Sequence, residues 1–380
     1  MKRVMTVLCG AGLLLAGLGS LQAAETIKIG ALFAVTGPAA FLGAPEAKTA
    51  QMLADQINAK GGVKGMKVEL IIKDTKGDPA TAVSFTKQLI EESGVLAIIG
   101  PSTSGETMQI KDLCEKNQTI LVSCAAAEVI VNPVAQYVFK TPQKDSQAAT
   151  WIFNAMKEKG LTKAGLLSSN DGFGSAGKKQ VEDMAAKAGI EIVISEVYDK
   201  SATDLTDVLA KVKAKNVQAV INWSIVPAQA ILAKNMKQIG MDAPLFQSHG
   251  FGNLKYVEQA GAAAEGILFP AGRLLIVDTL PDAHPQKAVL AQYKKDYESR
   301  FNEPVSTFGG HAYDAFMVVL AAVEKAGNDS KAVRAAIEQL QGFVGTGGIF
   351  NFTAEDHNGL GLDAFEMITV RAGKFVPAKQ

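Results

Sequence analysis

The chain has 380 residues, of which 48% are hydrophobic and 20% are charged, and its 38 basic and 38 acidic side chains give a formal net charge of zero. A balanced chain without runs of like charge is not expected to bind nucleic acid or an anionic membrane surface, so we expect a small or specific partner. A single hydrophobic core seldom supports a chain of this length, which predicts two domains.

Residues 1–23 have the composition of a secretory signal peptide. Lys2 and Arg3 precede an apolar run at 4–18, and small residues follow at the expected cleavage site, after Ala23 or Ala24. The apolar run is shorter than the ~20 residues of a membrane-spanning helix. We therefore expect an exported protein whose signal peptide is removed.

The first half of the remaining chain alternates between predicted strands and helices. Asp78 followed by Pro79 indicates the start of a helix, because Asp is a good N-cap and Pro is favoured at the first helical position. Strands are expected at 26–35, 67–74, 95–99 and 119–123, and helices at 43–60, 79–92 and 105–116. This alternation predicts a parallel sheet with helices on both faces.

The same alternation restarts at Asp145, which we expect to cap a helix that ends near residue 160. Strands are then expected at 164–168, 190–195, 219–223, 245–247 and 266–269, and helices at 174–188, 205–215 and 227–239. Helices at 285–302, 308–326 and 330–340 precede two final strands at 348–352 and 365–371. The sequence therefore predicts an α/β protein with two similar sheets in tandem.

Two glycine-rich patterns are typical of enzymes, but neither has the context that catalysis requires. Residues 171–177 contain G-x-G-x-x-G, the dinucleotide-binding pattern, yet three residues, 169–171, separate its first Gly from the preceding strand. The segment GPSTSG resembles the nucleophile motif G-x-S-x-G, except that Ser104 replaces the last Gly. An exported hydrolase with His249 or His311 as its base is therefore an alternative without a supporting motif.

The cysteines and histidines do not indicate a metal site. The histidines, at positions 249, 284, 311 and 357, are scattered, and no motif of paired metal ligands occurs, so we expect no metal and no cofactor. Beyond the signal peptide the chain contains Cys114 and Cys124. In an oxidising compartment they either form a disulfide or remain as two buried thiols.

The segment VLAIIGPSTSGET, at 95–107, is the strongest candidate for a binding site. It is a predicted strand that leads directly into a helix, and a helix N-terminus presents unpaired N–H groups and partial positive charge to an anion. Ser102, Thr103 and Ser104 supply three hydroxyls, whereas capping the helix requires one. Ligands of open α/β sheets bind beyond the carboxyl ends of the strands, so we expect a ligand here.

Six segments of the chain form an ordered set of motifs: IKIGALFAVTGPAAFLG, INAKGGVKGMKVELIIKD, GDPATAV, IIGPSTSGET, GFGSAG and GGHAYDAFMVVLAAVEKAG. In this order they resemble the periplasmic solute-binding proteins of branched-chain amino-acid ABC transporters, the Leu/Ile/Val-binding protein family of type I periplasmic binding proteins. The resemblance extends from about Thr26 to the C-terminus.

The resemblance implies a two-lobed clamshell, in which each lobe is a parallel sheet flanked by helices. The chain would cross between the lobes near 143–145, 270–273 and 358–363. Lobe 1 would contain residues 24–144 and 273–361, and lobe 2 would contain residues 145–272 and 362–380. The resemblance also implies no catalysis. The expected protein is a periplasmic monomer that delivers its ligand to a membrane permease, and a periplasmic ligand sensor on the same fold is the alternative.

The resemblance also assigns the two ends of an amino-acid ligand. A Ser at the position of Ser104 binds the carboxylate, together with N–H groups of the loop that matches 124–127. A Thr hydroxyl and an acidic side chain bind the ammonium group, and these positions hold Ala127 and His249 here. Either Glu128 supplies the missing negative charge, with Asp145 as a weaker candidate, or the ligand is a small carboxylate without an α-amino group.

Apolar side chains near the strand ends are expected to surround the rest of the ligand, an aromatic or branched aliphatic tail. For Trp223 at the end of its strand, packing in the core explains the residue equally well. The expected ligand-binding residues are Ser104, Thr103, Ser102, Cys124, Ala125, Ala127, Phe41, Leu42, Phe173, Trp223, His249 and Glu128.

Overall fold

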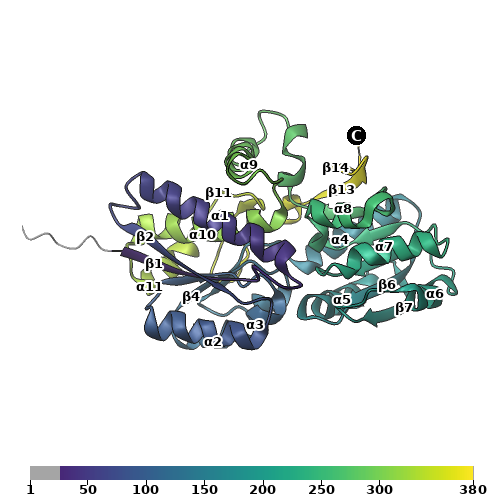
Figure 1. The fold of residues 1–380 in the computed structure, drawn as a ribbon, viewed down its shortest axis with the longest axis horizontal. Coiled ribbons are helices and arrows are strands. Elements are labelled where there is room, and N and C mark those ends of the chain that lie inside the picture. Colours follow the sequence, from purple (N-terminus) through teal and green to yellow (C-terminus); the bar gives the residue numbers. More distant parts are fainter. Residues whose placement is uncertain (1–25, 380) are drawn as a thin grey trace, which may run out of the picture.

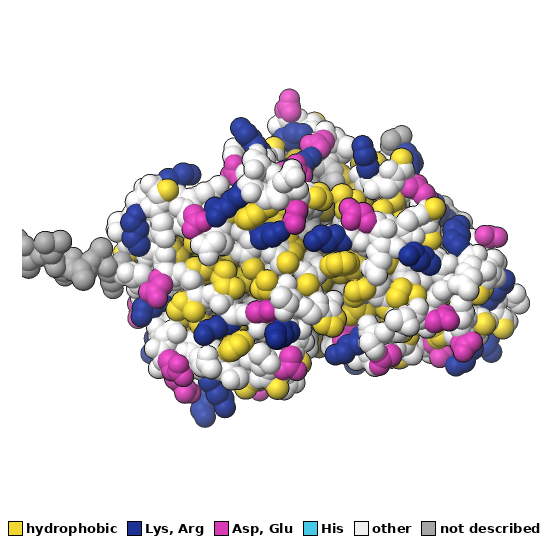
Figure 2. Space-filling view, viewed as in Figure 1, with side chains coloured by type: hydrophobic (Ala, Val, Ile, Leu, Met, Phe, Trp, Pro, Cys, Tyr) yellow, Lys and Arg dark blue, Asp and Glu magenta, His cyan; other side chains and the backbone are white. Residues whose placement is uncertain are grey.

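The computed structural model describes residues 26–379, which form two lobes, each built around its own sheet (Figure 1). The expected signal peptide and its cleavage site lie outside the described residues. Within 26–379, no helix is both long and apolar enough to cross a bilayer. Figure 2 shows side chains of both charge signs interspersed over the visible face, as the balanced composition predicts.

The first lobe contains a five-stranded parallel sheet in the order β2-β1-β3-β4-β5. Helix α1 lies on one face of this sheet, and α2 and α3 lie on the other (Figure 1). The elements are β1 (Thr26–Phe33), α1 (Ala40–Ala59), β2 (Lys67–Asp74), α2 (Pro79–Lys87), η1 (Gln88–Glu92), β3 (Ala97–Ile99), α3 (Ser104–Lys116), β4 (Ile120–Ser123), η2 (Glu128–Ile130) and β5 (Val138–Lys140).

The second lobe contains a seven-stranded sheet in the order β14-β13-β10-β9-β8-β6-β7. Its central strands are parallel, and the two C-terminal strands join it in antiparallel pairing. Its first elements are α4 (Asp145–Glu158), β6 (Lys163–Ser169), α5 (Gly172–Ala185), β7 (Glu191–Tyr198), α6 (Thr206–Lys213), β8 (Ala219–Trp223), α7 (Ala228–Gln238), β9 (Leu245–Gln247), η3 (His249–Phe251), α8 (Leu254–Ala260), η4 (Gly261–Ala264) and β10 (Leu268–Ala271).

The chain then returns to the first lobe and finally enters the second lobe again. The remaining elements are η5 (Arg273–Thr279), α9 (Lys287–Phe301), α10 (Thr307–Ala326), α11 (Ser330–Ile337), β11 (Phe343–Val344), β12 (Ile349–Phe350), η6 (Leu362–Ala364), β13 (Glu366–Arg371) and β14 (Lys374–Pro377). Helices α10 and α11 complete the layer that contains α1. The chain therefore passes between the lobes after β5, after β10 and before β13, which confirms the two-lobed fold with three crossovers.

The expected lobe boundaries, after residues 144, 272 and 361, lie in these three connections. We propose this division of the chain into lobes. Asp145 is the first residue of α4 rather than its cap, because Lys144 has the extended backbone of an N-cap residue. Strand β5 and helix α8 were not expected, since three and seven residues are too few to show a period. The second sheet also gains β14, which follows β13 through a tight turn.

The two cysteines are free thiols, so the disulfide alternative is wrong. Cys114 lies on the buried face of α3 and packs with Ile110 beneath the sheet. Cys124 follows β4 and belongs to the core on the opposite face, with Phe139. Burial raises the pKa of both thiols, that of Cys114 to about 12, so they are unreactive parts of the core.

Candidate functional site

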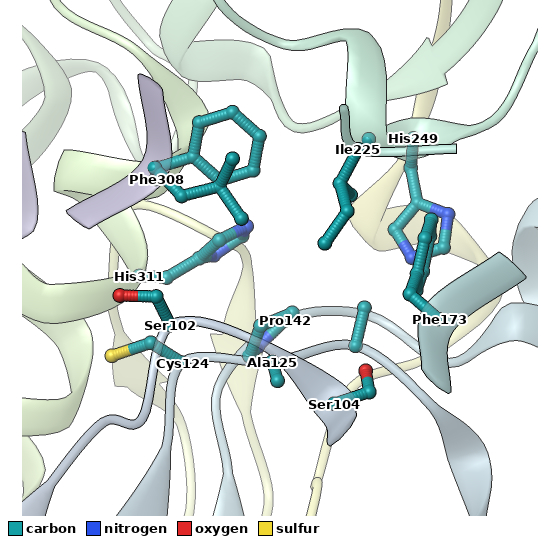
Figure 3. A pocket seen from close by; sticks show the side chains of 13 residues that line it. Ser102, Ser104, Cys124, Ala125, Pro142, Phe173, Ile225, His249, Phe308 and His311 are labelled. Atoms are coloured by element: carbon teal, nitrogen blue, oxygen red, sulfur yellow. The ribbon is translucent and has the colours of Figure 1, made fainter. Parts of the chain in front are cut away.

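A pocket with a cavity volume of about 20 Å³ lies between the two lobes, at the carboxyl ends of their strands (Figure 3). This volume holds little more than one water molecule, so a ligand needs the lobes or the lining side chains to move apart. The lining residues are Leu42, Ser102, Ser104, Cys124, Ala125, Ala126, Pro142, Phe173, Ile225, His249, Gly250, Phe308 and His311.

Both lobes and a crossover contribute to this lining. The first lobe supplies the residues at the start of α3 and after β4, and the second lobe supplies Phe173 from α5 and His249 from η3. Pro142 belongs to the first crossover between the lobes. Phe308 and His311 come from the first turns of α10, which is in the first lobe. A ligand in this pocket would therefore contact both lobes at once.

The three hydroxyls at the start of α3 have different roles. Thr103 is the N-cap, and its side chain forms a capping box with Glu106. Ser102 donates to the buried carboxyl of Glu46 and accepts from the backbone N–H of Ala34. Burial raises the pKa of Glu46 well above its usual range, and the Ser102 bond opposes this shift. Both hydroxyls therefore stabilise the loop, and Thr103 is not in the pocket lining.

Ser104 is the hydroxyl that remains for a ligand. Its Oγ accepts the backbone N–H of Ala127 at 3.2 Å, so its own proton is available to a ligand atom. In Figure 3 the Ser104 hydroxyl points into the pocket, whereas the heteroatoms of Ser102 and Cys124 point away from it. Ser104 is also the first residue of α3, where the backbone N–H groups favour an anion. This end of the pocket is suited to a carboxylate.

Two buried histidines face the pocket from different sides. His249 stands beside Phe173, with ring centroids 5.4 Å apart, and His311 lies on the opposite side next to Phe308 (Figure 3). Burial lowers the pKa of His249 well below its usual range, with a smaller contribution from Lys140. Burial likewise lowers the pKa of His311 to about 3. Both imidazoles are therefore neutral, and each can donate one hydrogen bond and accept another.

The candidate partners of an ammonium group lie outside the pocket lining. Glu128 accepts the backbone N–H of Ser146 at 3.2 Å, so its carboxylate is used at the start of α4. Asp145 is buried behind His249, with 3.7 Å between Oδ1 and Nε2. Lys140 donates to the backbone oxygens of Ala126 and Gln143. No Asp or Glu belongs to the described pocket lining.

The apolar side chains expected at the ligand divide into two layers. Leu42 and Phe173 line the pocket, whereas Trp223 lies behind Phe173 and His249. A Cβ added at Gly177 would lie 1.9 Å from Nε1 of Trp223. The indole is therefore packed in the core, which is the alternative that the sequence left open for Trp223. Phe41 packs edge-to-face on Tyr256 at the lobe interface, also outside the lining.

Comparisons with known proteins identify the family. The family model described as "Periplasmic binding protein" matches residues 26–371. The chain belongs to the periplasmic binding protein family. It is 29% identical to a leucine-, isoleucine-, valine-, threonine- and alanine-binding protein of Pseudomonas aeruginosa, over 83% of this chain and 83% of that protein.

Two solved ligand-binding proteins have closely similar folds. An extracellular ligand-binding receptor from Rhodopseudomonas palustris HaA2 has a TM-score of 0.87 at 26% identity, covering 93% of this chain and 99% of that one. The branched-chain amino acid transporter substrate-binding protein LivJ from Streptococcus pneumoniae, in complex with isoleucine, has a TM-score of 0.82 at 29% identity, covering 92% and 98%. The expected family resemblance and the solute-binding role are therefore confirmed.

The enzyme-like motifs have structural roles in this periplasmic binding protein. A Cβ at Gly172 would lie 2.7 Å from backbone atoms of Gly105 in the other lobe, and Gly177 leaves room for Trp223, so packing accounts for the glycine pattern. Neither ring nitrogen of the buried His249 has a hydrogen-bond partner, so it does not activate Ser104. Within the described chain, no group of three His, Cys, Asp or Glu could hold a metal ion.

Seven of the expected ligand-binding residues line the pocket, and five do not. The lining includes Leu42, Ser102, Ser104, Cys124, Ala125, Phe173 and His249, and it omits Phe41, Thr103, Ala127, Glu128 and Trp223. The lining also includes Pro142, Ile225, Phe308 and His311, which were not expected, together with Ala126 of the expected loop at 124–127 and Gly250, which follows His249. Ile225 lies two residues after the expected strand end at Trp223, which was an available signal, whereas nothing local to α10 indicated that its first turns reach the pocket.

Proposed function

We propose that this protein is the periplasmic binding component of an ABC importer and encloses a small hydrophobic carboxylate without an α-amino group. The observation that carries the proposal is the available Ser104 hydroxyl at the start of α3, in a pocket whose described lining has no carboxylate. The hydroxyl and the helix N-terminus favour an anion. A buried ammonium group would lack a counter-charge in contact with it, which is costly.

Closure of the two lobes supplies the mechanism of capture. Asn253 in the second lobe donates to the backbone oxygen of Phe41 in the first at 2.8 Å, and Thr307 donates its N–H to the oxygen of Gly252 at 3.0 Å. A ligand that contacts both lobes favours this closed arrangement by its differential affinity for it. The membrane permease would then recognise the closed form and receive the ligand.

The relatives favour a second candidate, a branched-chain amino acid, because the Pseudomonas aeruginosa protein and LivJ are described as binding such ligands. In this protein the ammonium group would need Asp145 or Glu128, both of which lie behind the pocket wall. Asp145 is the nearer candidate, since its Oδ1 lies 3.7 Å from Nε2 of His249, which lines the pocket.

Thermal unfolding of the purified mature protein distinguishes the two candidates, since a ligand that binds the folded state raises the unfolding midpoint, and at equal concentration the tighter ligand raises it more. The panel pairs leucine, valine and phenylalanine with the corresponding acids that lack the amino group, and titration calorimetry then measures each dissociation constant. We expect the deaminated acids to stabilise and the amino acids not to. Stabilisation by the amino acids alone would contradict the proposal and assign the ammonium group to Asp145 or Glu128.

A further inference from the structure

His311 is a buried polar side chain that the proposed carboxylate site does not use. It lies on the opposite side of the pocket from His249, and its ring is directed into the pocket (Figure 3). Its side of the lining includes Phe308, with the two rings edge-to-face at 6.3 Å. The backbone oxygen of His311 accepts a hydrogen bond from Thr141 at 2.9 Å, which fixes this turn of α10.

One ring nitrogen of His311, Nδ1, is fully buried and makes no hydrogen bond within the described chain. The nearby hydroxyl of Ser102 is already occupied by Glu46 and Ala34, and in Figure 3 it points away from the pocket. Leaving a buried nitrogen unpaired costs free energy, so a polar atom in the pocket is needed to satisfy it.

We propose that His311 binds a hydroxyl group of the ligand, at the end remote from the carboxylate that Ser104 binds. The substrate class is then a hydroxylated hydrophobic acid, aromatic or aliphatic, rather than a purely hydrocarbon acid. This inference rests on the proposed function and specifies its ligand. Leu42, Ile225 and Phe308 would contact the hydrocarbon part between the two polar ends.

The chemistry of the pocket selects a hydroxyl over other polar groups. A hydroxyl both donates and accepts, so it fits whichever tautomer of the neutral imidazole is present. A second carboxylate would need a positive charge, and burial keeps His311 neutral, while Lys140 already donates to the oxygens of Ala126 and Gln143. An amino group at this end would need an acidic side chain, and the described lining contains none.

The experiment compares pairs of acids that differ only in the distal hydroxyl, by titration calorimetry with the full mature protein. The probes are benzoate with para-hydroxybenzoate, phenylpropanoate with its para-hydroxy derivative, and hexanoate with its terminal hydroxy derivative. We expect the hydroxylated member of the best-fitting pair to bind about tenfold more tightly or better, since a site with a buried polar group discriminates against the analogue that leaves this group unpaired.

Variants then test whether His311 causes the preference for the hydroxylated acid. His311→Leu is expected to bring the affinity ratio of the pair close to one, and His311→Gln, which keeps a donor and an acceptor, to retain part of it. His284→Leu is the matched control, because it makes the same substitution at a histidine outside the described pocket lining, and it should leave the ratio as in the wild type. The thermal midpoint of each variant reports folding, and if His311→Leu does not fold, His311→Gln and the wild type decide.

The outcomes separate this inference from the proposed function. Equal affinities within every pair for the wild type, or an unchanged ratio in His311→Leu, would overturn the assignment of His311 while carboxylate binding stands. If no acid of either kind binds and amino acids do, the proposed function fails and this inference fails with it.

Discussion

The Nε2 atom of His249 lies 3.7 Å from Oδ1 of Asp145, directly behind the pocket wall where the chain first passes between the lobes. Both side chains are almost completely buried, and the separation is too long for a direct hydrogen bond. Burial raises the pKa of Asp145, and the positive charge of Lys140 opposes this shift. An imidazole backed by a carboxylate therefore occupies the position at which the family resemblance implies an acidic side chain.

We expect the double variant His249→Glu, Asp145→Asn to gain affinity for leucine by about tenfold or more and to lose affinity for the deaminated acid. Glu at 249 would supply the negative charge that a buried ammonium requires, and Asn at 145 avoids two adjacent carboxylates. Titration calorimetry with leucine and with the deaminated acid measures both changes in affinity. The control is the double variant His249→Gln, Asp145→Asn, because glutamine has about the size of glutamate but no charge. Equal leucine affinity in the two double variants would contradict the prediction.

Acid should destabilise the protein through its buried histidines. Burial lowers the pKa of His311 to about 3 in the native state, whereas an unfolded chain has a histidine pKa of about 6.5. Between these values the unfolded state binds a proton that the native state does not, so the free energy of unfolding decreases as the pH falls below 6.5. The contribution of His311 approaches about 1.4 kcal/mol per pH unit.

Urea unfolding at a series of pH values between roughly 7 and 5 tests this contribution. We expect His311→Gln to lose less stability than the wild type over this range, because the substituted residue does not titrate. His284→Gln is the control, since His284 is only partly buried and should change the slope much less. Parallel curves for His311→Gln and the wild type would show that His311 is protonated in the native protein.

The alternation of strands and helices could be predicted because each long element shows its own period. β2 and β8 begin and end at the expected residues, and α10 begins one residue before its expected start. The short strands β5 and β11 were missed, since pairing with neighbouring strands, not local pattern, makes them strands.

The end of the candidate site at Ser104 could be predicted because a single segment contains all the residues that indicate it. A helix that follows a strand through small hydroxyl residues indicates an anion site, and Ser104 lies there. The sequence could not show which of three adjacent hydroxyls is free, because this depends on Glu46, which lies on α1. It also could not bring His311 to the pocket, because α10 reaches the site only after the chain has returned from the second lobe.

Ser104→Ala is expected to weaken carboxylate binding by ~1 to 3 kcal/mol, the usual scale for a hydrogen bond to a charged group. Ser102→Ala is its matched control, because the Ser102 hydroxyl forms its hydrogen bonds with Glu46 and with the backbone of Ala34 and points away from the pocket. This second variant should lose ~1 to 3 kcal/mol of unfolding free energy and keep near-native affinity. Calorimetry and urea unfolding of both variants measure the two effects, and a larger loss of affinity in Ser102→Ala would reverse the assignment.

A close approach between the two lobes, at Gly105 and Gly172, predicts a variant that blocks closure without damaging either lobe. A Cβ added at Gly172 would lie 2.7 Å from both N and Cα of Gly105, which is too close for backbone atoms. A Cβ added at Gly105 would lie 3.8 Å from the nearest atom of Gly172, an ordinary contact. Gly172 is the first residue of α5, where alanine is compatible with the helical backbone.

We therefore expect Gly172→Ala to weaken ligand binding by about tenfold or more, with the ligand-free thermal midpoint unchanged, and Gly105→Ala to bind as the wild type does. The reason is that binding requires the closed state, and a ligand's apparent affinity falls with the fraction of molecules that can close. Small-angle scattering with saturating ligand should show a larger radius of gyration for Gly172→Ala than for Gly105→Ala. Equal affinity and equal radius in the two variants would mean that the lobes bind their ligand without this contact.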